Sequence, residues 1–400
     1  MGSPLLLLGA GNDPNSERGV LCPGDLPAPD DPALQERARA AREALGNDVF
    51  ILGHHYQRDQ VIDFVDARGD SFELSRRASM VNAPYIVFCG VHFMAESASI
   101  LARDEQSVIL PDLGAGCSMA DMAEEHQVVD AWARLERAGV ASSTVPLTYM
   151  NSAASIKAFC GERHGAICTS SNAAQAMRWA FDEALEDADR SATKVLFLPD
   201  QHLGRNTAVL GLGLQLKDCV VYDPWKPDGG CTDRELHDAR VILWKGHCSV
   251  HARFQPEMVH AIRDRFAGVE VFAHPECRHE VVIEADRIGS TGQIIEWVRH
   301  APAGATIAIA TELNLVKRLD DEHPDKRIVF LDDTVCFCAT MNRIDLPHLV
   351  WVLEALVDGE VINEVRVDER TRHWARIALE RMLALPGDGA SIRRVVTTSA

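Results

Sequence analysis

Three long stretches of this chain repeat one order of elements, and this repeat limits the folds open to the chain more than any other feature. Each stretch contains an apolar run that ends in polar residues, a helical segment, a turn rich in hydroxyl groups, a second apolar run and a last apolar run followed by a cysteine. Short β-rich runs that alternate with amphipathic helical segments are typical of an α/β fold with parallel sheets. We therefore expect three related α/β units, because self-similarity at a long spacing indicates a repeated architecture.

Polar residues end the first run of each stretch, where their side chains can bind ligands or transfer protons. The three runs are Phe50–Tyr56, Val145–Asn151 and Val271–Glu276, and the hydroxyl-rich turns are Gly69–Ser71, Cys168–Asn172 and Gly289–Thr291. Ligands of parallel α/β sheets bind beyond the carboxyl ends of the strands. The pattern therefore predicts one active site to which all three units contribute. The turns also suit helix N-caps, whose amides and hydroxyls can bind an anion.

A cysteine follows the last run of each stretch, at Cys117, Cys248 and Cys338. Three thiolates can hold a 4Fe-4S cluster and leave one iron free to bind a substrate as a Lewis acid. Zinc is the competing metal, because three thiolates and one further ligand suit its tetrahedral geometry. Zinc sites usually draw their ligands from closely spaced pairs, whereas these cysteines lie far apart in the sequence. The spacing therefore favours the iron-sulfur cluster.

The remaining cysteines provide a few alternatives to these three ligands. Cys336 lies two residues before Cys338, so spacing alone does not decide between them. Cys231 and Cys277 rank lower, since neither occupies the repeated position. The cysteines expected to be structural are Cys22, Cys89, Cys160 and Cys219.

The net charge of −19 limits the partners that this chain can bind. Nucleic acids are bound through clustered Lys and Arg, and no basic stripe is present in the sequence. An anionic substrate must therefore be held by helix N-termini, hydroxyl groups and imidazoles. No apolar stretch approaches the about 20 residues that a membrane-spanning helix needs. With eleven cysteines and no evident secretion signal, the chain is expected to be a cytoplasmic protein with reduced thiols.

Composition and pattern also predict the domain boundaries. The expected parts are a flexible extension at 1–30, a first domain at 31–120 completed by C-terminal helices at 342–388, a second domain at 121–250, a third domain at 251–341 and a tail at 389–400. The second domain is longer than the others, and we assign the excess to a surface insertion at about 217–236, where Pro, Gly and Trp cluster.

Three histidines at the ends of apolar runs or near a cysteine are candidates for proton transfer. They are His54, His251 and His274, and imidazole can transfer protons near neutral pH. Glu276 lies two residues after His274. Burial would raise the pKa of this carboxyl group, as a general base requires, so we expect Glu276 to act as a base. Taken singly, each of these histidines could equally be a surface or hydrogen-bonded core residue.

Taken together, these motifs closely resemble the quinolinate synthase family from about Asp48 to the helix after Met341. The motifs that carry the resemblance are His54–Gln57, Gly69–Ser75, Gly116–Asp121, Tyr149–Asn151, Cys168–Ala173, Gly246–His251, His274–Cys277, Gly289–Thr291 and Cys338–Met341. The resemblance implies three three-layer αβα domains, related by a pseudo-threefold axis around a central active site. It also implies a 4Fe-4S cluster held by Cys117, Cys248 and Cys338.

The resemblance further implies a transferase that condenses iminoaspartate with dihydroxyacetone phosphate to give quinolinate, phosphate and water for NAD biosynthesis. Transient contact with L-aspartate oxidase, the source of iminoaspartate, is left open. Tyr56, His251 and Glu276 would manage protons. The residues that would bind substrate are His54, Ser71, Tyr149, Asn151, Ser170, His274, Ser290 and Thr291. None of these is Lys or Arg, which agrees with the expectation that helix N-termini, hydroxyl groups and imidazoles hold an anionic substrate.

Two other functions fit parts of the same pattern. An iron-sulfur hydro-lyase that acts on another hydroxy acid would use the same open iron and proton-transfer groups. A cluster-based sensor of oxygen or iron would need a macromolecular partner, and the sequence has no nucleic-acid-binding patch. We therefore favour an enzyme.

Overall fold

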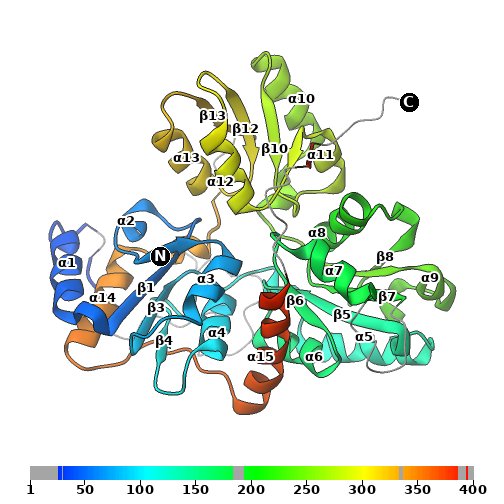
Figure 1. Cartoon of the computed structure of the whole chain (residues 1–400), viewed down its shortest axis with the longest axis horizontal. Coiled ribbons are helices and arrows are strands. Elements are labelled where there is room, and N and C mark those ends of the chain that lie inside the picture. The colour runs from blue at the N-terminus through cyan, green and yellow to red at the C-terminus, as the bar shows by residue number, and fades with distance from the viewer. Residues whose placement is uncertain (1–25, 29, 183–192, 333–336, 386–392, 395–400) are drawn as a thin grey trace, which may run out of the picture. The chain divides into compact units, whose positions relative to one another are not determined.

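The computed structural model describes residues 26–28, 30–182, 193–332, 337–385 and 393–394 (Figure 1). The predictions for Cys22 and Cys336, and for most of the two terminal segments, lie outside these residues. The chain divides into two compact units, one made of residues 1–121 and 338–368 and the other of residues 122–337 and 369–400.

A four-stranded parallel sheet forms the centre of the first unit, in the order β2-β1-β3-β4. The strands are β1 (Val49–His54), β2 (Ala67–Gly69), β3 (Tyr85–Cys89) and β4 (Ser107–Ile109). The accompanying helices are α1 (Leu34–Leu45), α2 (Asp59–Ile62), α3 (Ser71–Ala78), α4 (His92–Leu101) and α14 (Leu346–Val357). Helix α14 packs against α1 through Leu34, Ala38 and Val350, so residues far apart in sequence share one core.

A five-stranded parallel sheet forms the first part of the second unit, in the order β6-β5-β7-β9-β8. Its strands are β5 (Thr144–Tyr149), β6 (Ala166–Cys168), β7 (Lys194–Leu198), β8 (Cys219–Tyr222) and β9 (Val241–Trp244). Its helices are α5 (Glu125–Arg137), α6 (Ala154–Glu162), α7 (Ala173–Asp182), α8 (Gln201–Asn206), α9 (Asp233–Asp238) and α15 (Glu369–Ala384).

The segment at 217–236, which we expected to be a surface insertion, supplies the edge strand β8 of this sheet. Tyr222 and Leu236 from this segment are buried in the same core as Trp244, and the Tyr222 and Trp244 rings stack at 5.8 Å. The segment is therefore part of the sheet and its core.

The third sheet has the order β13-β12-β10-β11-β14 and also belongs to the second unit. Its strands are β10 (Glu270–Ala273), β11 (Arg287–Ile288), β12 (Thr306–Ala310), β13 (Arg327–Phe330) and the short β14 (Arg393–Arg394). All pairs are parallel except β11 with β14. Helices α10 (Pro256–Arg265), α11 (His279–Glu284), α12 (Thr291–His300) and α13 (Leu313–Glu322) accompany the sheet. The predicted α/β class with three parallel-sheet units is thereby confirmed.

The two C-terminal helices, both of which we assigned to the first domain, pack in different units. Helix α14 contacts α1, whereas α15 packs along α6 and β6 of the second unit (Figure 1). The other domain boundaries stay predictions. None of the helices in the described part of the chain has both the length and the apolar character to span a bilayer.

Close packing of α15 on α6 depends on a glycine. A Cβ atom at Gly161 would collide with the backbone carbonyl oxygen of Trp374. We expect Gly161→Ala to lower the free energy of unfolding by about 1–3 kcal/mol, as overpacking of a tight contact usually does. Urea denaturation followed by circular dichroism would measure the loss. Gly211→Ala is the matched control, since its Cβ would lie 3.4 Å from the nearest atom, the Cβ of Ala174; an equal loss in both variants would contradict the prediction.

Candidate active site

A buried carboxylate, Glu276, forms the centre of the candidate site in the second unit. It lies in the loop after β10 and is only 3% exposed. The Tyr149 hydroxyl, at the end of β5, donates a hydrogen bond of 2.6 Å to Glu276 Oε1. His251 Nδ1 lies 3.3 Å from Oε2, and His274 Nδ1 lies 3.6 Å from Oε1. Three residues, at or after the ends of three different strands, therefore meet at the carboxyl group of Glu276.

The two histidines of this group stack on each other. Their ring centroids are 4.4 Å apart, with an angle of 21° between the planes, and both side chains are buried. His274 directly follows β10, and His251 begins a short 3₁₀ helix (His251–Arg253) after β9. His251 Nε2 also lies 3.3 Å from the hydroxyl of Thr311, which follows β12. The contacts from neighbouring strands hold both imidazoles in defined orientations.

The pKa of Glu276 shifts in the direction opposite to our prediction. Burial by itself raises this pKa, but the charges of His251 and His274, together with hydrogen bonds from His251 and Tyr149, lower it to about 2. The expectation that desolvation makes Glu276 a stronger base is therefore wrong. An ionised carboxylate of low basicity is better suited to holding and polarising the two imidazoles than to removing a proton itself.

Asp200 is a second buried carboxyl group beside the site, and it is not among the predicted site residues. It caps α8, where its Oδ1 accepts hydrogen bonds from the amides of His202 (2.7 Å) and Leu203 (2.8 Å). Burial and the negative charge of Glu276 raise the pKa of Asp200 well above its ordinary value, although the amide of Cys248 also donates to it. The available signal was an aspartate at the end of a strand and the start of a helix, the position of an N-cap.

Cys248 lies close to His251 and Glu276, and together these three residues could hold a metal ion. One ligand atom each from Cys248, His251 and Glu276 lies within 4.8 Å of the others. Metal ions are commonly bound by thiolates and imidazoles, in addition to carboxylates. The second unit thus contains a potential metal site made of three residue types, and Cys248 belongs to the predicted cluster ligands.

The other two predicted ligands, Cys117 and Cys338, lie in the first unit and are partly buried. Burial, with a smaller contribution from the neighbouring Cys338, raises the pKa of Cys117 to about 12. Backbone amides of Ala120 and Met119 donate to the Cys117 sulfur and oppose this shift. A buried thiol whose ionisation needs a compensating cation, with amide donors and a second thiol beside it, is suited to be a ligand of an iron-sulfur cluster.

Two of the cysteines expected to be structural are packed in protein cores. Cys89 and Cys160 are fully buried, as is Cys277, which we had ranked as a weak ligand candidate. The Cys231 thiol donates to the carbonyl group of Val221 at 3.4 Å. Cys219 is partly buried in β8.

The remaining predicted site residues lie at strand ends and helix starts in both units. In the first unit, His54 ends β1 and its ring contacts the Tyr56 ring edge-on at 4.6 Å, while Ser71 begins α3. In the second unit, the buried Oδ1 of Asn151 has no hydrogen-bond partner among the described residues. Ser290 caps α12, and its hydroxyl accepts from the amide of Gln293 at 3.5 Å.

Comparison with known proteins gives the class of this chain. The family model described as quinolinate synthetase A protein matches residues 36–384. A quinolinate synthase from Nocardioides sp. is 62% identical over 385 residues, which cover 96% of this chain and 97% of the relative. The quinolinate synthase of Streptomyces coelicolor is 61% identical and covers 96% of each chain. That of Geobacillus kaustophilus is 53% identical and covers 88% of this chain and 93% of the relative.

The parallel α/β units and the buried acid-base group therefore belong to an enzyme. The chain is a member of the quinolinate synthetase A family, as the sequence motifs indicated.

Proposed function

We propose that this protein catalyses the quinolinate synthase reaction of NAD biosynthesis. It condenses iminoaspartate with dihydroxyacetone phosphate and releases quinolinate, phosphate and water. The group of Tyr149, His251, His274 and Glu276 beside Cys248 is the observation that supports this function most strongly, in a chain whose family match spans residues 36–384.

The two substrates are anionic, and polar uncharged groups and imidazoles bind them. His274, Asn151, Ser290 and Thr291 bind the carboxylates of iminoaspartate. The buried Oδ1 of Asn151, which has no hydrogen-bond partner in the described part of the chain, and the helix start at Ser290 support this assignment, since both offer polar groups to a ligand. His54, Ser71 and Ser170 bind the triose phosphate. Tyr149 completes the site through its hydrogen bond to Glu276.

Cys117, Cys248 and Cys338 are the proposed ligands of a 4Fe-4S cluster. When bound, such a cluster with one open iron supplies Lewis-acid assistance for the loss of hydroxide from the substrate. Glu276 contacts Nδ1 of His251 and Thr311 contacts Nε2, and these two contacts orient the ring. His251 can exchange a proton with the substrate at Nε2 when a substrate group takes the place of the Thr311 hydroxyl. Tyr56 lies against the His54 ring and serves as a second proton donor. Burial of His251, His274 and Glu276 excludes water from the imine.

The proposed partners are small molecules, and the proposed location is the cytoplasm. The imine of iminoaspartate hydrolyses in water, which gives a reason for transient contact with L-aspartate oxidase. Membranes and nucleic acids have no part in this proposal.

Product analysis with single substrates omitted tests the proposed reaction. Anaerobically purified protein should form quinolinate only when iminoaspartate and dihydroxyacetone phosphate are both present, because each supplies part of the pyridine ring. Quinolinate is followed by chromatography, and phosphate release should match it in amount. Dehydration of a hydroxy acid without the triose phosphate, and no quinolinate, would support the hydro-lyase and refute the proposal.

A further inference from the structure

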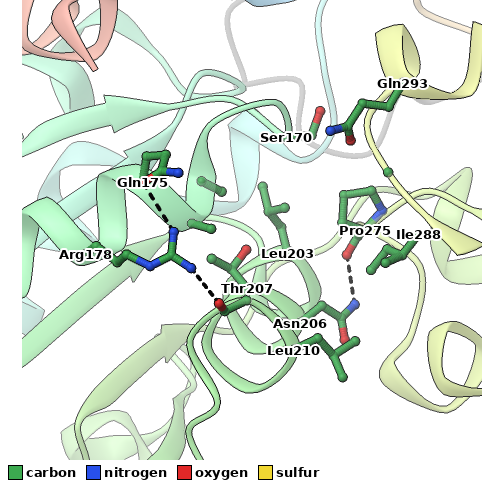
Figure 2. Close-up of a pocket in the computed structure, with 14 residues that line it drawn as sticks. Ser170, Gln175, Arg178, Leu203, Asn206, Thr207, Leu210, Pro275, Ile288 and Gln293 are labelled. Carbon is green, nitrogen blue, oxygen red and sulfur yellow. Dashed lines mark hydrogen bonds between the residues drawn. The ribbon is translucent and has the colours of Figure 1, made fainter. Parts of the chain in front are cut away.

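A cavity of about 140 Å³ lies in the second unit, next to the candidate site (Figure 2). On one side are α7, α8 and the π-helix at Thr207–Gly211; on the other are Pro275 and the segment from Ile288 to Gln293. Ser170, a proposed phosphate-binding residue, lines it. Pro275 separates the two site residues His274 and Glu276 in the sequence. The cavity therefore borders the site but extends beyond the residues assigned to it.

Arg178 is the one charged residue among the fourteen described residues that line this cavity. Its guanidinium group donates to Gln175 Oε1 at 3.2 Å and to the carbonyl oxygen of Gly211 at 2.8 Å, as Figure 2 shows. Both partners are neutral, and no carboxylate of the described residues forms an ion pair with it. Its positive charge is therefore not neutralised, in a chain whose net charge is −19.

Other groups around the cavity are suited to the same kind of ligand. Ser170 and Thr207 contribute hydroxyl groups, and the first turn of α7, at Ala173 and Ala174, also lines the wall. The amides of a first helical turn attract negative charge, and a guanidinium group binds the oxygens of a phosphate with particular strength. A cation with nearby hydroxyl and amide donors is the arrangement that a small oxyanion requires.

We propose that this cavity is a phosphate-binding site in which Arg178 is the principal ligand-binding residue. Hydrogen phosphate binds between the guanidinium group, the Thr207 hydroxyl and the first turn of α7. Given the proposed function, the phosphate is the one released from the triose phosphate, and it passes from Ser170 to Arg178 as it leaves. Its source depends on the proposed function, whereas the binding of phosphate does not.

Calorimetric titration of the cluster-loaded protein with inorganic phosphate tests the site directly. Arg178→Gln should weaken phosphate binding about tenfold or more, because it removes a charge-assisted hydrogen bond. Arg178→Lys should restore part of the affinity by restoring the charge. Arg205→Gln is the matched control: it removes the same charge from the neighbouring helix α8, at a residue that does not line the cavity. The Arg205→Gln variant should bind phosphate with the same affinity as the unchanged protein.

Three results would overturn the proposal: no phosphate binding by the unchanged protein, equal affinity in Arg178→Gln, or an equal loss in Arg205→Gln. Titration with phthalate, a dicarboxylate, separates the classes of anion; if Arg178→Gln lost phthalate binding and kept phosphate binding, the assignment to phosphate would be wrong. Thr207→Val provides a second variant that leaves the Arg178 contacts in place, and it should also weaken phosphate binding. Because the titration needs no turnover, its outcome is independent of the quinolinate assay.

Discussion

Replacing Cys248 with serine should remove the proposed iron-sulfur cluster and the quinolinate-forming activity together. A cluster is held by thiolates, and a serine hydroxyl does not ionise near neutral pH to replace one. The same loss is expected for Cys117→Ser and Cys338→Ser. Iron and sulfide analysis of anaerobically purified variants, with the absorbance of the brown protein, would measure it. The substitution removes no buried hydrophobic side chain from a core, since all three cysteines are partly exposed.

Cys219→Ser is the matched control for these variants. This thiol is also partly buried, and burial raises its pKa to about 11, but it lies in β8 and follows none of the three repeated strands. The variant should keep its iron and its activity. Cys336→Ser should also keep both. If Cys336→Ser lost the cluster and Cys338→Ser kept it, the third ligand would be Cys336.

Glu276→Gln should lower kcat by about 10² to 10⁴, the range usually lost with a group that supports acid-base catalysis. Glutamine has nearly the same volume and can still accept the hydrogen bond from Tyr149, but it cannot supply the negative charge that faces His251 and His274. Steady-state kinetics with both substrates would measure the change, and thermal unfolding would show whether the fold is intact.

Tyr149→Phe distinguishes the effect of the Glu276 charge on kcat from the effect of the hydrogen bond that Tyr149 donates to Glu276. This variant removes the 2.6 Å bond and leaves the carboxylate. Since that bond is one of the factors that lower the pKa of Glu276, the pKa should rise while the ion pairs with the histidines remain. The loss in kcat should therefore be smaller than in Glu276→Gln. If Glu276→Gln kept full activity, Glu276 would have a structural role and no role in catalysis.

The repeated order of strands and helices was enough to predict three parallel-sheet units, because the apolar runs form strands of the expected sheets. It also predicted that Tyr149, His274 and Glu276 would lie at strand ends and that His251 would lie close to Cys248, and the structure brings these four residues together. Periodicity did not distinguish the edge strand β8 from a loop, since its segment is rich in Pro and Gly. These residues more often mark turns.

Properties that depend on tertiary contacts could not be derived from the sequence. The direction of the Glu276 pKa shift is set by the neighbouring His274 and by an imidazole and a phenol from other strands, and their combined effect outweighs burial. Asp200 and Arg178 were missed for a related reason. A capping aspartate and a helical arginine are common residues, and only the surrounding structure shows that one is buried beside Glu276 and that the other lines a cavity.

Mössbauer spectroscopy of the ⁵⁷Fe-loaded protein, prepared without oxygen, tests the central claim most directly. The account predicts a single 4Fe-4S cluster in which one iron changes its spectrum when substrate is added, while the three irons bound by Cys117, Cys248 and Cys338 do not. A cluster whose four irons all stay unchanged on substrate binding, or a colourless protein that holds zinc in place of iron, would contradict it.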